Sequence, residues 1–228
     1  MVLTEGPRRA EALLVCDTAS LLDILRSPVE GPKAVSERTN ARSLLARVEA
    51  GKLAVLAPER VFVELKRNRE RVVRDARESL VAYQKNVRAV YGLMAKEGFG
   101  APPGEIRPDD YVEVLDGQLR SWIAHLVPMP QSEDAVTRAL HRVDRHDAPS
   151  HDSKKQELWD CIIVETLLEG IRSLRDQGVD SRCLFLSSNT SDYKDPDNPQ
   201  ARSPLREEFE ALDIRYVPSF AEAMRRFR

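Results

Sequence analysis

The 228-residue sequence is short of cysteine, of long apolar runs and of net charge, and each shortage excludes a class of protein. Its three cysteines, Cys16, Cys161 and Cys183, show no CxxC spacing, and each has apolar neighbours. This pattern excludes a zinc or disulfide framework and predicts buried thiols in a reducing compartment, which we take to be the cytoplasm. The sequence has no window of about 18 apolar residues and no sustained apolar run at its start, so we expect neither a membrane span nor a signal peptide.

The balance of charge limits the kind of partner that the chain attracts. A formal net charge of −2 gives no global attraction to nucleic acid, so binding of that kind needs a local basic patch. The sequence also lacks the Gly-rich loop GxxxxGK followed by Ser or Thr, which argues against a phosphatase or nucleotide hydrolase built on such a loop. Apolar residues make up 42% of the chain, which is enough for a hydrophobic core.

Short apolar runs alternate with stretches of helical spacing along the chain. Strands are expected at 12–16, 53–56, 182–186 and 214–217, the last at a sheet edge, and 127–130 is interpreted as an extended link. Helices are expected over 21–25, 36–49, 61–96, 109–126, 131–143, 154–170, 207–212 and 220–227. This alternation predicts an α/β fold in which a parallel sheet carries helices on both faces. We expect one domain over 1–228, with a helical insertion at 66–150.

The helix expected over 154–170 carries an acid in its most apolar part. Asp160 has Trp159 and Cys161 beside it and aliphatic residues beyond them, so this helix is expected to be buried. An ionised carboxylate there costs on the order of several kcal/mol unless a cation or a set of donors faces it. Asp160 is therefore either part of a buried salt bridge or cap, or part of a metal site with carboxylates from elsewhere in the chain.

Three further acids follow the expected strands. Asp17 comes directly after the first strand, Glu64 soon after the second, and Asp192 shortly after the third. Because sites in open α/β sheets form at the carboxyl ends of the strands, we expect these side chains and Asp160 to meet at one rim. Taken singly, Asp17 also fits an N-cap and Glu64 a solvated helix residue, and these alternatives stay open.

A cluster of carboxylates repels itself. Two carboxylates about 4 Å apart repel by roughly 4 kcal/mol at an effective dielectric near 20. Such a cluster persists with bound divalent cations or with some acids protonated. Carboxylate ligands without cysteine or paired histidine favour hard ions such as Mg²⁺ or Mn²⁺, which activate water and stabilise the leaving oxygen in phosphodiester hydrolysis.

Basic residues are concentrated in one stretch, residues 66–77, which we call the basic stripe. It contains six Lys or Arg residues, and three acids lie within it or directly after it: Lys66, Arg67, Arg69, Arg71, Arg74 and Arg77, with Glu70, Asp75 and Glu78. The stripe fits a surface that binds phosphates, and it fits equally a solvated helix face joined by ion pairs between residues four apart.

Four segments, taken in order, resemble the acidic motifs of the PIN-domain nucleases: LLVCDTASLLDIL, LAPERVFVEL, HDSKKQELWDCIIVETLL and CLFLSSNTSDY. The chain is longer than the compact toxins of that family and is more similar to a larger subgroup with the HDSK and DC signature. The resemblance implies a three-layer α/β/α fold and metal-dependent cleavage of RNA. It implies that Asp17, Glu64 and Asp160 are the first three acids of the metal site, and that Asp192 is a fourth, more variable one.

The resemblance also implies roles for neighbouring residues. Asn189 falls where many members carry Asp, and Ser188 matches a small hydroxyl residue that supports the first acid or its water. Lys154, within the HDSK segment, is expected to neutralise a bound phosphate or to pair with an acid of the cluster. Together with Lys66 and Arg67, these residues form the predicted substrate-binding set.

The leading hypothesis is therefore a Mg²⁺- or Mn²⁺-dependent endoribonuclease. A second hypothesis is the toxin of a toxin–antitoxin pair, with the same chemistry and a small antitoxin or regulatory protein as partner. A third is a non-catalytic module that keeps the fold and binds RNA or protein. RNA is the expected partner in the first two cases, no membrane partner is expected, and a homodimer is left open.

Overall fold

The structure is a computed structural model that describes residues 10–27, 29, 31–100, 104, 107–151 and 157–227. Within these residues, five strands form a parallel sheet in the order β3-β2-β1-β4-β5. The strands are β1 (Ala12–Cys16), β2 (Leu53–Pro58), β3 (Val127–Met129), β4 (Arg182–Leu186) and β5 (Ile214–Val217). The predicted strands are confirmed, and the last one lies at an edge as expected.

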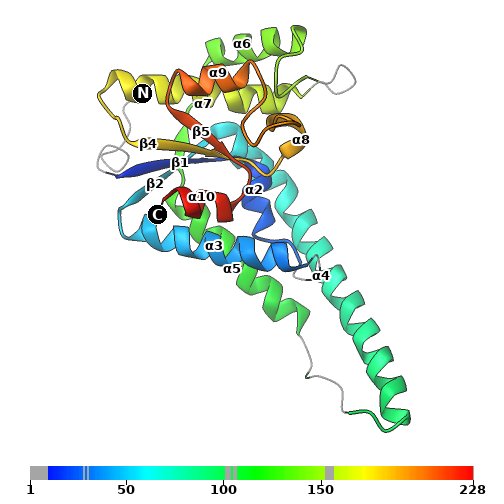
Figure 1. Ribbon diagram of the computed structural model, residues 1–228. Helices are drawn as coiled ribbons and strands as arrows, with labels where there is room; N and C mark the ends of the chain where they lie inside the picture. The colour runs from blue at the N-terminus through cyan, green and yellow to red at the C-terminus, as the bar shows by residue number, and fades with distance from the viewer. Residues whose placement is uncertain are drawn as a thin grey trace.

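Helices cover both faces of this sheet. They are α2 (Thr18–Asp23), α3 (Pro32–Glu49), α4 (Glu59–Lys96), α5 (Pro108–His125), α6 (Glu133–Asp144), α7 (Leu158–Asp176), α8 (Thr190–Tyr193), α9 (Leu205–Glu210) and α10 (Phe220–Arg226). Figure 1 shows α6, α7 and α9 on one side of the sheet and α3, α5 and α10 on the other. The fold is therefore the three-layer α/β/α architecture that was expected.

The strands are apolar on both faces because helices cover both. Every residue of β1 is buried, and in β4 only the first residue is exposed. Side chains of alternate residues enter opposite layers of the core, so such strands show apolar runs instead of alternation. The thiols of Cys16, Cys161 and Cys183 are buried and unpaired, which confirms their predicted place in the core. None of the described helices is long and apolar enough to cross a membrane.

The order of the strands creates one place where the connections change direction. From β1 the chain moves outward to β2 and then β3, and it returns to place β4 on the other side of β1. Loops that leave the carboxyl ends of β1 and β4 therefore run in opposite directions. Open α/β sheets form their ligand sites at such a switch point.

Three parts of the sequence interpretation need correction. Residues 127–129 are the edge strand β3, paired with β2, instead of a link. The short helix α8 lies in a stretch for which no helix was predicted. The described part of α7 begins at Leu158, and the expected start at Lys154 lies outside the described residues. The division of the chain at 66–150 stays a prediction, and β3 within that range pairs with the sheet.

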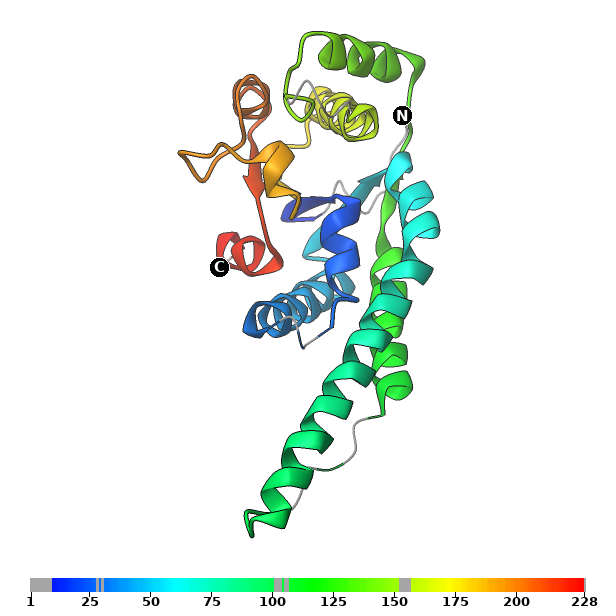
Figure 2. The same ribbon diagram turned by 90° about the vertical axis from the view of Figure 1, so that its right-hand side faces the viewer.

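Helix α4 forms an arm that leaves the body of the molecule. It has 38 residues, which corresponds to a length of about 57 Å. Its first half lies beside α5 in both views (Figures 1 and 2), and Ala76, Leu80 and Val112 pack between the two helices. Its amino-terminal turns lie at the carboxyl edge of the sheet, so the arm begins where the predicted site is.

Candidate metal centre at the carboxyl edge of the sheet

Asp17 follows β1 directly, and two donors hold its carboxylate. The backbone N–H of Thr18 donates to Oδ1 at 2.7 Å, and the Ser187 hydroxyl donates to Oδ2 at 2.6 Å. Only 2% of the residue is exposed. Asp17 is also the N-cap of α2. The two interpretations of Asp17 from the sequence, as an N-cap and as an acid of the site, are thus compatible, because one carboxylate fills both roles.

Glu64 reaches the same place from the second turn of α4. The Thr18 hydroxyl donates to its Oε2 at 2.8 Å, and the Arg60 guanidinium donates to its Oε1 at 3.3 Å. Its side chain is 19% exposed, so the alternative of a solvated Glu64 is wrong. Thr18, which the sequence interpretation did not select, links two acids by donating its N–H to Asp17 and its hydroxyl to Glu64.

A third group of acids completes the cluster. Carboxylate oxygens of Glu157, Asp160 and Asp192 lie within 4.8 Å of one another. Asp192 belongs to α8, and the Asn189 amide donates to it at 2.8 Å. Glu157 is the N-cap residue of α7, and Asp160 lies in its first turn. The sequence interpretation missed Glu157, although its spacing of three residues from Asp160, which places both on one helix face, was available as a signal.

Asp160 interacts electrostatically with four other acids. We call these five residues the acid cluster: Asp17, Glu64, Glu157, Asp160 and Asp192. Burial, followed by the charges of the other four carboxylates, raises the pKa of Asp160 to about 8. Burial disfavours the charged form, and like charges nearby do the same. The structure thus brings the four predicted acids together and adds a fifth.

Asp17 is held between opposing influences. Burial and, to a smaller extent, the charge of Glu64 raise its pKa, the hydrogen bonds from Ser187 and Thr18 lower it, and the net result is a pKa of about 6. Within the described ranges, no ion pair joins Asp17 or Asp160 to an arginine or lysine. A buried acid without a cation favours the binding of one, so the geometry and charge suit a metal ion.

The hydroxyl that supports Asp17 belongs to Ser187, so the prediction of this role for Ser188 is wrong. Leu186 pairs with Cys16 in the sheet, and the next residue on each strand is therefore Ser187 beside Asp17. Ser188 instead donates its N–H to Ser20 Oγ at 2.8 Å. The predicted contacts of Ser188 and Asn189 with substrate stay predictions.

Several arginines of the basic stripe are engaged in ion pairs. Arg69 binds Asp116 of α5 through two hydrogen bonds, of 2.6 and 2.5 Å, and Arg77 lies 2.6 Å from Asp109. Arg71 pairs with Asp75 along α4 at 3.5 Å. The ion-pair interpretation is confirmed for these three arginines, two of which hold α5 against α4.

The rest of the predicted substrate-binding set remains open. Lys66 and Arg67 are exposed just beyond Glu64, and no ion pair joins either to another residue in the described part of the chain. Their contact with substrate stays a prediction. Lys154 lies outside the described residues.

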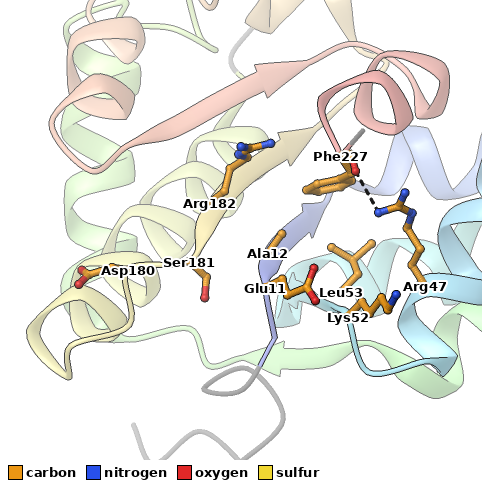
Figure 3. A pocket seen from close by; sticks show the side chains of 9 residues that line it. All are labelled: Glu11, Ala12, Arg47, Lys52, Leu53, Asp180, Ser181, Arg182 and Phe227. Carbon is orange, nitrogen blue, oxygen red and sulfur yellow. Dashed lines mark hydrogen bonds between the residues drawn. The ribbon is translucent and has the colours of Figure 1, made fainter.

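A cavity of about 440 Å³ lies at the opposite edge of the sheet (Figure 3). The first residues of three strands, Ala12, Leu53 and Arg182, line it. Arg47, also in its wall, donates to the carbonyl oxygen of Phe227 at 3.0 Å, as the dashed line in Figure 3 shows. This cavity contains none of the predicted site residues, so it is separate from the acid cluster at the carboxyl edge.

Comparison with known proteins agrees with this geometry. A family model described as a PIN domain matches residues 15–193, a range that includes the whole acid cluster. No curated protein and no solved structure matches the chain.

Proposed function

The chain belongs to the PIN-domain family, a nuclease-type family, and on this premise we propose that it is a Mg²⁺- or Mn²⁺-dependent endoribonuclease that hydrolyses RNA phosphodiester bonds. One observation carries the proposal. The carboxylates of Asp17, Glu64, Asp160 and Asp192, from four separate segments, meet at one edge of the sheet, and Glu157 joins them.

The donor set suits a hard divalent cation. The acids offer only carboxylate oxygens, which are the ligands that Mg²⁺ and Mn²⁺ prefer. Two thiols lie next to the cluster in sequence, those of Cys16 and Cys161, and burial raises the pKa of each. Neither thiol is therefore expected to ionise, and neither supplies a thiolate that would favour zinc.

A bound ion of this kind would lower the pKa of a water molecule that it binds and would stabilise the negative charge on the leaving oxygen. The protein's own groups hold and orient the ligands. Ser187 and Thr18 fix the carboxylate of Asp17, Thr18 also fixes Glu64, and Asn189 fixes Asp192. Such outer hydrogen bonds keep ligating oxygens in place before the ion binds.

The substrate strand is expected to run over the exposed residues beside the cluster. We assign its phosphate contacts to Lys66 and Arg67 on α4, and to Lys154. A net charge of −2 supports a local patch over a general attraction to RNA. Each phosphate contact makes binding weaker at high salt, so affinity for RNA is expected to fall as salt rises.

The proposal is tested with purified protein and end-labelled single-stranded RNA, in Mn²⁺ and in EDTA. Wild-type protein should cleave in Mn²⁺ and not in EDTA. Asp160→Asn should reduce the cleavage rate more than about 100-fold, because even the loss of a group that only orients a ligand costs about 10- to 100-fold. Asp176→Asn, at the exposed far end of the same helix, is the matched control and should keep the wild-type rate. Equal rates for the two variants would reject the proposal.

A further inference from the structure

The two tryptophans of the chain lie in different surroundings. Trp122 is 0% exposed in the core, whereas Trp159 is 49% exposed in the first turn of α7, directly before Asp160. Single exposed apolar side chains are common, so exposure alone assigns no role to Trp159. What sets it apart is the group that covers its ring.

The guanidinium of Arg60 lies over the Trp159 ring, with its central carbon 3.4 Å from the ring centroid. The Arg60 side chain is only 11% exposed, and it also pairs with Glu64 at 3.3 Å. A largely buried cation thus covers one face of the indole and ties it to α4, while about half of the residue remains open to solvent. The ring is held in place before any ligand arrives, so less side-chain freedom is lost on binding.

Both members of this stack are directly connected to the acid cluster. Trp159 precedes Asp160 in the chain, and Arg60 shares an ion pair with Glu64. A flat ligand on the open face of the indole would therefore lie beside the place where the cluster acts. In an RNA strand bound with a phosphate at the cluster, the flat groups nearest to that phosphate are the bases of the two nucleotides that it joins.

We propose that Trp159 is a base-stacking residue, on which an unpaired base adjacent to the scissile phosphate lies flat while Arg60 supports the indole from the other face. The inference rests on the proposed function, because the cluster fixes where the phosphate binds. Every base has an aromatic face, so stacking on tryptophan tolerates any sequence. In a duplex the neighbouring base pairs cover these faces, so the platform selects unpaired nucleotides.

A structural role alone is the competing explanation, since the same stack joins α4 to α7. The two explanations differ in what happens when the base is removed from the RNA. A stacking residue matters only for a strand that has a base at that position, whereas a structural residue matters equally for a strand that lacks it.

The test measures the fluorescence of Trp159 during binding, in the presence of Mg²⁺, the ion through which the acid cluster is proposed to hold the phosphate. The parent protein carries Trp122→Phe, which leaves Trp159 as the only indole, and Asp160→Asn, which stops cleavage and reduces repulsion of the phosphate. Trp122→Phe removes a ring nitrogen that has no hydrogen-bond partner among the described residues. Single-stranded RNA should quench the indole emission, and an abasic strand or a duplex of equal length should quench it much less.

Binding of dye-labelled RNA to substituted proteins supplies a second readout. Trp159→Leu should weaken binding of a normal single strand about 5- to 100-fold, the range found when a stacking aromatic is removed, and should leave binding of the abasic strand unchanged. Trp159→Phe, the conservative variant, should restore most of the loss. Equal binding of the normal strand by the parent and the leucine variant, or absence of quenching in the parent, would overturn the inference.

The outcomes separate the two proposals. Mn²⁺-dependent cleavage by wild-type protein without quenching in the parent would reject base stacking and keep the nuclease. Quenching confined to unpaired strands, without cleavage by wild-type protein, would keep the stacking residue and reject the nuclease.

Discussion

Helix α7 carries two acids with opposite surroundings, the buried Glu165 and the partly buried Asp160. Glu165, which is 6% exposed, accepts hydrogen bonds from Arg142 at 2.6 and 3.0 Å and from Arg138 at 2.9 Å. Asp160, five residues earlier, has no such partner among the described arginines and lysines, and its pKa is raised to about 8. The fold is therefore able to neutralise a buried carboxylate with its own cations, and it does so for Glu165 but not for Asp160.

The difference between Glu165 and Asp160 indicates that the first acid stabilises the fold and the second belongs to a binding site. Arg142 is 1% exposed and also donates to Glu208 and to the carbonyl of Ala148, so it ties α6, α7 and α9 together. At the acid cluster Arg60 pairs with Glu64, but no described arginine or lysine forms an ion pair with Asp17 or Asp160, and the positive charge for these two acids is left to a bound ion. The same residue types thus stabilise the fold at one point and create a binding site at the other.

The largest effect is expected from removing the cation of the structural group. Arg142→Met leaves the buried Glu165 without its main partner and also removes a cation from the partly exposed Glu208, and it should lower the free energy of unfolding by about 3–5 kcal/mol. Urea unfolding followed by circular dichroism measures this. Arg145→Met is the control, because its pair with Asp147 involves a side chain that is 63% exposed, and it should cost less than about 1 kcal/mol. A similar loss in both variants would remove the contrast drawn between the two groups.

At the acid cluster we expect a substitution to raise the free energy of unfolding, by less than Arg142→Met lowers it. In metal-free protein, Asp160→Asn should raise the free energy of unfolding by about 1–3 kcal/mol at pH 8, less than the ~4 kcal/mol by which two close carboxylates repel. The folded-state pKa lies above the ordinary 3.8, so the folded protein binds more protons and loses stability as pH rises toward about 8. The gain should therefore shrink at pH 5. Urea unfolding in EDTA at pH 8 and at pH 5 measures this difference in stability. A wild-type protein as stable as the variant at pH 8 would show that the carboxylates do not repel one another as proposed.

A smaller effect is expected from the hydrogen bond that holds Asp17. Ser187→Ala removes the 2.6 Å donor and so raises the pKa of Asp17 further, which should weaken Mn²⁺ binding at pH 7 about 10-fold. Calorimetric titration with Mn²⁺ measures this. Ser188→Ala, one residue along, is the control and should bind the ion as wild type does. Equal weakening in both would show that Ser187 has no special part in holding Asp17.

Most of the sheet could be predicted because its strands are short apolar runs with clear ends. The strands at 12–16, 182–186 and 214–217 have the predicted bounds. β3 could not be recognised, because a three-residue edge strand with Pro128 at its centre has too few apolar positions to show a pattern. Pairing with β2, which makes it a strand, is a property of the folded chain alone.

The site was predictable in outline for a related reason. Asp17 and Asp192 follow strands, and parallel strands bring their ends together, so topology alone places these acids near each other. Contacts that depend on one residue of register or on a side-chain direction were not predictable. Ser187 was confused with Ser188 in this way, and the stacking of Arg60 on Trp159 joins residues about a hundred positions apart.

Asp17 has two roles, as the N-cap of α2 and as an acid of the cluster, and together they restrict which residues position 17 accepts. Asparagine, serine and threonine would start α2 but bring no negative charge, and glutamate would keep the charge on a side chain that caps poorly. Aspartate alone meets both demands. Asparagine therefore isolates the loss of charge while the helix keeps its first turn, whereas alanine would disturb chemistry and folding at once.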